Sequence, residues 1–168
     1  MSINDQKGFT MLEVLVAIII FSFGLLGLAG LQLVSLANNL SANSRSTATA
    51  LAYDMADRMR ANMQGAFAGN YNNIAGADNA CQAIHYDDVH AAPVTCTAVQ
   101  LAQDDVYDWK KVVAGSLASG TATVCIDSTP NTAACDGTGT TYAVRVSWND
   151  KPKNDAATIK TVAIEFKP

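Results

Sequence analysis

The stretch KGFTMLEVLVAIIIFSFGLLGLAGLQLVSLA, residues 7–37, decides how the chain is organised. After Glu13 it holds no charged residue, and the next charge along the chain is Arg45. A membrane-spanning helix needs about 20 apolar residues, and residues 14–36 supply them. Lys7 precedes the run, which favours a cytoplasmic N-terminus and an exported remainder. Glu13 is the anomaly, because a carboxylate inside a membrane costs roughly 2.5–3.5 kcal/mol and usually marks a functional position.

Composition limits the partners and the compartment. The 168 residues suffice for one domain, the formal net charge is -4, and the 11 basic residues are scattered, so nucleic acid is not an expected partner. The four cysteines follow the apolar stretch, without a Cys-x-x-Cys pair or zinc-finger spacing to a histidine. They predict two disulfides and an oxidising compartment, a periplasm or the cell exterior. Four buried free thiols are the alternative.

The apolar stretch has three interpretations. A secretory signal peptide would be cut after Ala37, although the run is long for that purpose and begins with Glu13. In a plain single-pass anchor, Glu13 would raise the free energy of the inserted helix without serving a function. The third interpretation rests on the residues at the start of the run: Lys7-Gly8-Phe9-Thr10-Met11-Leu12-Glu13.

This heptapeptide resembles the prepilin signature of the type IV pilins and the type II secretion pseudopilins. The resemblance implies that prepilin peptidase cuts between Gly8 and Phe9, removes the leader 1–8 and methylates the new amine of Phe9. It also assigns the family's glutamate to Glu13. A carboxylate that is unpaired in lipid could meet the N-terminal amine of a neighbouring subunit in a filament, which would set the register of assembly.

A helix is expected over about residues 9–64, because helical periodicity persists and no proline occurs before Pro93. Residues 9–37 would form the membrane and filament-core half and 38–64 the second half, with Gly65 as a stop. The second half carries an apolar stripe that should pack against a globular head: Ala48, Leu51, Ala52, Met55, Met59 and Met63.

Three glycines lie at three-residue spacing within the first half: Gly24, Gly27 and Gly30. Each costs about 1 kcal/mol in a helix interior relative to alanine. They indicate either close helix packing in the membrane or a locally weak helix that can stretch when subunits bundle.

The head, residues 65–168, should be disulfide-bonded and periplasmic. A long loop over 65–93 precedes a short helix over 97–117, and three alternating segments predict strands at 121–127, 141–149 and 158–167. Short connections predict an antiparallel meander with one face on the long helix. The fold class is therefore α+β, a pilin-like long N-terminal helix packed on a small antiparallel sheet.

The cysteines of the head allow three pairings. Cys125 and Cys135 flank one turn and are natural partners, which leaves Cys81 with Cys96. The pairing is not decided by this argument, and the other two connectivities stay open.

The sequence shows no catalytic constellation and indicates no cofactor. His85 and His90 fall in the loop, without a Ser/His/Asp grouping, a His-Glu-x-x-His motif or a phosphate-binding glycine loop. Four loop acids lack an EF-hand pattern, so we expect them to be solvated rather than to bind calcium: Asp87, Asp88, Asp127 and Asp136.

The resemblance extends most closely to the PilV-type minor pilins, on the run that follows Gly8 and on the segment Tyr142-Ala-Val-Arg-Val-Ser-Trp148. The last cysteine, Cys135, lies far from Pro168, unlike the terminal disulfide loop of major pilins. This implies a non-enzymatic minor pilin that supports pilus assembly, twitching motility and adhesion. Its expected partners are other minor pilins, the major pilin, prepilin peptidase, the inner-membrane assembly platform and, before assembly, lipid. A type II secretion pseudopilin, or a binding domain with a conventional signal peptide, are the alternatives.

Overall fold

The computed structural model describes residues 10–82, 94–129, 134–150 and 158–168. The predicted leader, the Gly8–Phe9 junction and the loop histidines fall outside these residues. The chain divides into two units, Met1–Ala42 and Asn43–Pro168. Helix α1, Met11–Ala61, supplies nearly all the described residues of the first unit and the first element of the second.

Helix α1 ends three residues earlier than the sequence predicts. Asn62 leaves helical geometry and caps a short second helix, α2, Met63–Phe67. Its side chain accepts a hydrogen bond from the Gly65 N–H at 3.2 Å and donates to the Tyr71 hydroxyl at 3.0 Å. Gly65 is therefore a residue within α2 and not the predicted stop, because an asparagine side chain that competes with the backbone ends the helix first.

The predicted apolar stripe lies in the core of the head. Ala48, Ala52, Met55 and Met59 are fully buried, while Leu51 and Met63 pack partly buried against the same core. The stripe confirms the prediction that the second half of the long helix carries the head.

Helix α3, Ala98–Ser116, confirms the predicted short helix almost to the residue. A capping box starts it, since Thr97 Oγ1 accepts from the Gln100 N–H while the Gln100 side chain accepts from the Thr97 N–H. Ala102, Val106, Trp109 and Val113 are buried, whereas Val99, in the first turn, is half exposed.

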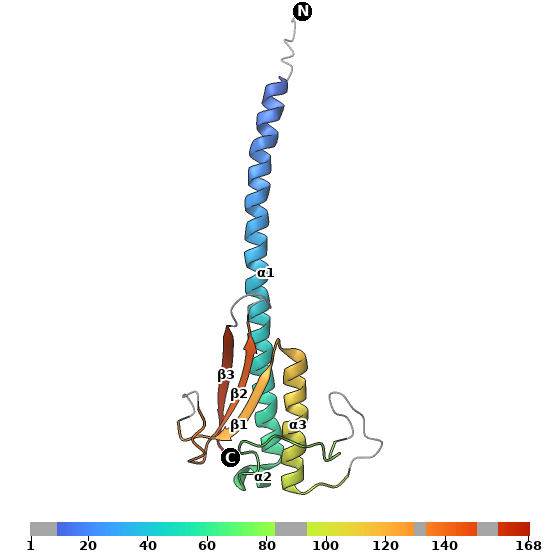
Figure 1. Cartoon of the computed structure of the whole chain (residues 1–168), viewed down its shortest axis with the longest axis vertical. Helices are drawn as coiled ribbons and strands as arrows, with labels where there is room; N and C mark the ends of the chain where they lie inside the picture. The colour runs from blue at the N-terminus through green and yellow to red at the C-terminus, as the bar shows by residue number, and fades with distance from the viewer. Residues whose placement is uncertain (1–9, 83–93, 130–133, 151–157) are drawn as a thin grey trace, which may run out of the picture. The chain divides into compact units, whose positions relative to one another are not determined.

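The sheet is the predicted antiparallel meander, in the order β1-β2-β3. Its strands are β1, Thr121–Ile126, β2, Tyr142–Asn149, and β3, Ile159–Phe166. Figure 1 shows α3 beside the C-terminal part of α1, with the sheet packed alongside. The even-numbered strand residues face this core: Ala122, Val124, Ile126, Tyr142, Val144, Val146, Trp148, Val162, Ile164 and Phe166.

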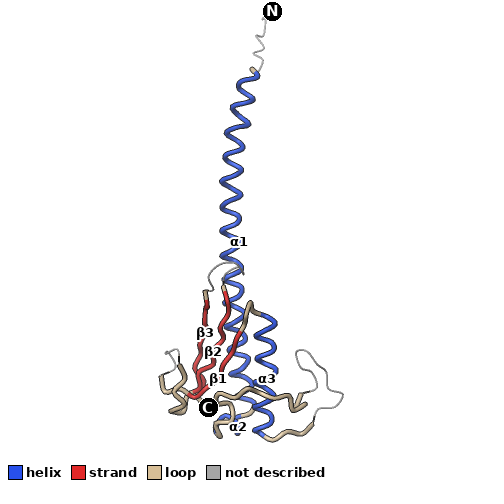
Figure 2. The backbone as a smooth tube through the Cα atoms, viewed as in Figure 1, coloured by secondary structure: helices blue, strands red, loops and turns tan. Residues whose placement is uncertain are grey.

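Both expected disulfides are present. Cys81 pairs with Cys96 at a Cα–Cα distance of 5.7 Å, and Cys125 pairs with Cys135 at 6.1 Å. The first ties the segment that follows α2 to the residue before the cap of α3, two parts of the chain that Figure 2 draws as loop and helix. The pairing that the turn argument favoured is confirmed.

Candidate functional site

The N-terminal unit carries an apolar surface that no other described residue of the chain covers. Every described residue from 10 to 40 is exposed, and the large apolar side chains among them each expose 45% or more of their surface. Helix α1 is long and apolar enough to cross a membrane by length and composition. A helix that is apolar on all sides needs lipid or other apolar helices around it, because contact between so large an apolar surface and water is unfavourable.

Glu13 lies in the first turn of α1. Its backbone N–H donates to the Thr10 carbonyl at 3.1 Å and to Thr10 Oγ1 at 3.4 Å, so Thr10 starts the helix. The N-terminal end of a helix dipole favours a negative charge there. Within residues 10–168, as far as the structure describes them, no cation lies within ion-pair distance of its carboxylate.

The surface beside Glu13 is apolar. A shallow depression runs along the helix from Glu13 and is lined by Val14, Ala17, Ile18 and Phe21. Glu13 thus borders an apolar surface against which another helix can pack.

The three helix glycines share an open environment. A Cβ atom built on Gly24, Gly27 or Gly30 would meet no other atom within 4 Å. They make no close contact inside this chain, so any packing role must involve a second molecule.

Two family models match consecutive parts of the chain. The model of the prokaryotic N-terminal methylation motif matches residues 3–29, and the model of type IV pilin Tt1218 matches residues 30–107. Together they cover more than half of the 168 residues. The chain belongs to the type IV pilin family. No curated protein and no solved structure shows a significant match to it.

The family accounts for the exposed helix of this pilin, because the methylation-motif model covers Glu13, Gly24 and Gly27. Gly30 is the first residue after it. The type IV pilins are a structural, non-enzymatic family that assembles with other pilins and is processed by prepilin peptidase. The apolar surface of α1 is thus a membrane anchor and later part of a pilus.

The pilin head contains an ionic cluster centred on Arg58. Arg58 of α1 pairs with Asp54 of the same helix at 3.0 Å, reaches across to Asp108 of α3 at 2.9 Å and lies 3.9 Å from Asp105. The Tyr71 hydroxyl donates to Asp105 at 2.6 Å. The cluster joins α1, α3 and the loop after α2 within the head.

Burial is the largest influence on the pKa of two members of this cluster, Asp105 and Tyr71. It raises the pKa of Asp105, despite the opposing hydrogen bond from Tyr71 and the charge of Arg58. Burial, followed by the bond to Asp105, raises the pKa of Tyr71 far above its ordinary value. The sequence did not predict that three acids of α3 are buried, because acidic side chains in the middle of a helix are usually solvated. They are Asp104, Asp105 and Asp108.

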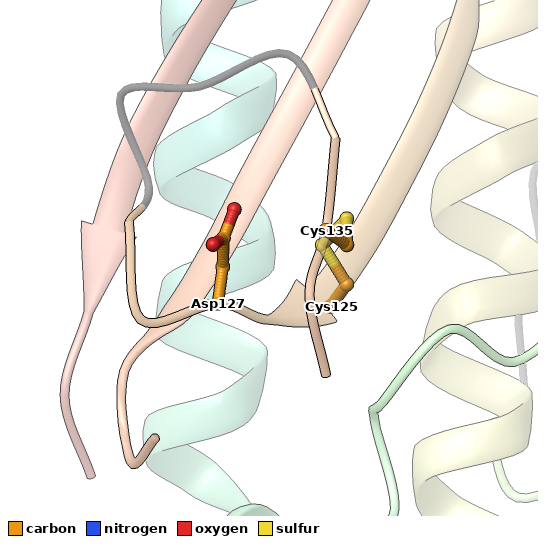
Figure 3. Close-up of side chains that lie close together, drawn as sticks. All are labelled: Cys125, Asp127 and Cys135. Carbon is orange, nitrogen blue, oxygen red and sulfur yellow. A yellow bond between two sulfur atoms is a disulfide. The ribbon is translucent and has the colours of Figure 1, made fainter. Parts of the chain in front are cut away.

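A second charged pair lies on the opposite face of the sheet. Arg145 of β2 donates through Nη2 to Asp127 and through Nη1 to both sulfurs of the Cys125–Cys135 disulfide. Figure 3 shows Asp127 and the disulfide close together where β1 ends. The hydrogen bond from Arg145, then the bond from the Thr129 N–H, lowers the pKa of Asp127.

The prediction that Asp127 is a solvated loop acid is wrong, because its side chain is fully buried against Arg145. Its approach to Cys125 and Cys135 does not make a metal centre, since both sulfurs are joined to each other and offer no thiolate. Asp136 is exposed as expected and accepts hydrogen bonds from Ser128 and Thr138, which lowers its pKa. Asp87 and Asp88 fall outside the described residues.

Proposed function

We propose that this protein is a minor pilin of a bacterial type IV pilus. One observation carries the proposal: the part of α1 that the methylation-motif model covers is exposed on every side, and a single carboxylate, Glu13, lies among its apolar residues. Prepilin peptidase removes residues 1–8 and methylates Phe9. The subunit then waits as a single-pass inner-membrane protein, with residues 9–37 in lipid, 38–64 leading outward and the head, 65–168, in the periplasm.

Glu13 acts as the register device of assembly. Its carboxylate lies beside apolar residues and has no cation near it in the described chain, so lipid is a costly place for it. The methylated amine of a neighbouring Phe9 is a cation carried at the same end of each subunit. A subunit therefore leaves the membrane most favourably where this amine completes the pair, since an unpaired buried charge is worse than a paired one.

A minor rather than a major role is supported by the position of the disulfides. Both bonds join residues that precede β2, so neither ties down the β2–β3 hairpin. This agrees with the resemblance to the PilV-type subunits. The protein would then prime assembly together with other minor pilins, the major pilin and the inner-membrane platform, and affect twitching motility and adhesion through the number of pili.

The test is deletion of the gene, followed by complementation with wild type, Glu13→Ala or Glu13→Asp. We expect loss of surface pili on deletion and recovery with wild type. The Glu13→Ala protein should be cleaved but enter filaments poorly, whereas Glu13→Asp, which keeps the charge, should be less impaired. Intact piliation with loss of exoprotein secretion would instead identify a type II secretion pseudopilin, and entry of Glu13→Ala into filaments at wild-type level would refute the register role.

A further inference from the structure

The two edges of the sheet in the head differ in how their backbone groups are used. Asp150 N–H donates to the Thr158 carbonyl at 3.1 Å, one step beyond the last pair of the β2–β3 register. In an antiparallel pair, the residues that exchange hydrogen bonds alternate along each strand. The even-numbered residues of β3 therefore bond to β2, and its odd-numbered residues direct their N–H and C=O groups away from the sheet.

The same reasoning applies to β1. Asp127 N–H donates to the Thr141 carbonyl at 2.9 Å, so the odd-numbered residues of β1 bond to β2 and the even-numbered ones point outward. Two of these outward positions are already engaged. The Val124 carbonyl accepts from the Asn73 N–H at 2.8 Å, and the Ile126 N–H donates to Asn72 Oδ1 at 2.8 Å. The segment after α2 thus covers the β1 edge at Val124 and Ile126.

The β3 edge is open. No other described residue forms a backbone hydrogen bond with its outward positions, and the side chains at all of these positions are exposed: Ile159, Thr161, Ala163 and Glu165. The strand contains no proline or bulge that would prevent pairing, and Figure 1 shows it at the side of the sheet away from α3. Native proteins usually protect an edge of this kind, so an open and regular one is a ready surface for strand addition.

We propose that the β3 edge binds an edge strand in the head of a different pilin, next to this subunit in the same filament. This inference rests on the proposed function, because helices bundled in one filament make neighbouring subunits point the same way. Since β1 and β3 run parallel within one head, a neighbour in the same orientation would present a β1-type strand to β3 and form a parallel pair.

A second copy of this chain does not fit the edge. Its own β1 edge is occupied at Val124 and Ile126. Two β3 strands from copies that point the same way could pair only with their sheets facing opposite directions, which would place the two α1 helices on opposite sides of the combined sheet. The head can therefore extend its sheet on one side only, which suits a subunit that occurs once beside a different pilin and does not repeat.

The experiment uses the full-length protein in its native membrane, with a photo-activated cross-linking amino acid at Glu165, on the open edge. The matched control carries the same amino acid at Thr121, an exposed residue of β1 on the opposite edge, which Asn72 and Asn73 partly cover. We expect the Glu165 probe to form an adduct, and its second peptide to map to a head strand of another chain with its own N-terminal methylation motif. The Thr121 probe should form none.

Ala163→Pro tests the backbone bonds themselves. The N–H of Ala163 points away from β2, so proline is tolerated there by the fold but blocks strand addition. Loss of one backbone bond and the added ring should lower the Glu165 adduct about tenfold, whereas Ala163→Ser, which keeps the N–H, should leave it unchanged. Retention of both disulfides and of the wild-type unfolding temperature would show that the Ala163→Pro head is folded.

The inference is overturned by an adduct with a second copy of this chain or with a protein outside the pilins, by no adduct, or by an adduct that Ala163→Pro leaves intact. These outcomes are separate from a failure of the proposed function. If the mature protein begins at Phe9 and its entry into pili depends on Glu13 while the adduct is missing, only the edge inference is wrong.

Discussion

Replacing Arg58 with methionine should destabilise the head far more than the same change at Arg60, two residues along the same helix. Methionine keeps much of the aliphatic length of arginine but removes the guanidinium. Arg58 lies between three carboxylates, and its side chain is only 20% exposed. The side chains of Asp105 and Asp108 are 8% and 6% exposed, so they would lose their shared cation without gaining water.

The expected size follows from this burial. Removing one partner of a buried ion pair costs about 3–5 kcal/mol, because the other charge stays buried and uncompensated. We take the lower end, about 3 kcal/mol, since Arg58 itself reaches some solvent and Tyr71 still donates to Asp105. For a head of this size that is roughly a 10 °C fall in the midpoint of thermal unfolding. The loss should shrink as the pH falls, because burial raises the pKa of Asp105 and its carboxyl group, left without Arg58, can then be protonated.

The assay is thermal unfolding of the full-length protein in detergent, with both disulfides oxidised, followed by the near-ultraviolet circular dichroism of the head. Arg60→Met is the control, because Arg60 and its partner Asp57 are 56% and 70% exposed. An exposed pair contributes about 0–1 kcal/mol. Equal unfolding midpoints for the two variants would refute the reasoning that the Arg58 cluster joins α1 to α3.

Three further predictions concern processing and the head. Gly8→Val should leave the full-length precursor in the membrane on an immunoblot, since a branched residue hinders approach to the bond; normal maturation would contradict the cleavage model. Asp105→Asn should flatten the pH dependence of unfolding, because the raised pKa of Asp105 gives stability that is full below its unfolded pKa and lost as the pH rises through the folded one; an unchanged slope between pH 4 and 7 would show that Asp105 does not titrate there. Gly76→Ala should lower the free energy of unfolding in urea by about 1–3 kcal/mol. The reason is that Gly76 has φ +88° and an added Cβ would lie 2.5 Å from the Tyr107 nitrogen. Gly137→Ala is the control, since Gly137 has open space around it, and a smaller loss of stability for Gly76→Ala than for this control would contradict the prediction.

The regular parts of the fold could be predicted because each is set by a local pattern. The apolar residues of α1 recur every three or four positions, and those of the strands recur every second position. These two periods determine which side chains of each element enter the core. The capping box at Thr97 and Gln100 is a local signal as well. Glu13 stood out as a candidate for a different reason. A single acid in an apolar run is unfavourable in a membrane and therefore indicates a functional position.

The rest depended on contacts between distant parts of the chain. Asn62 ends α1 because its amide also reaches the Ala98 carbonyl, 36 residues away, at 2.8 Å. Asp127 is buried because Arg145 lies on the neighbouring strand, and Asp108 because it meets Arg58 from another helix. Each of these acids reads as a surface residue in its own segment, and only the tertiary fold supplies its cation. The difference between the two sheet edges likewise depends on where Asn72 and Asn73 come to lie.

The intact mass of the protein from its native membrane shows whether this chain is processed and exported as a pilin. We expect a chain that begins at Phe9, carries one extra methyl group, and is about 4 Da lighter than its reduced form, two hydrogens for each of two disulfides. A chain that begins at Asn38 would mean that an ordinary signal peptidase cut it, and a soluble exported domain without α1's apolar half would contradict assembly into a filament.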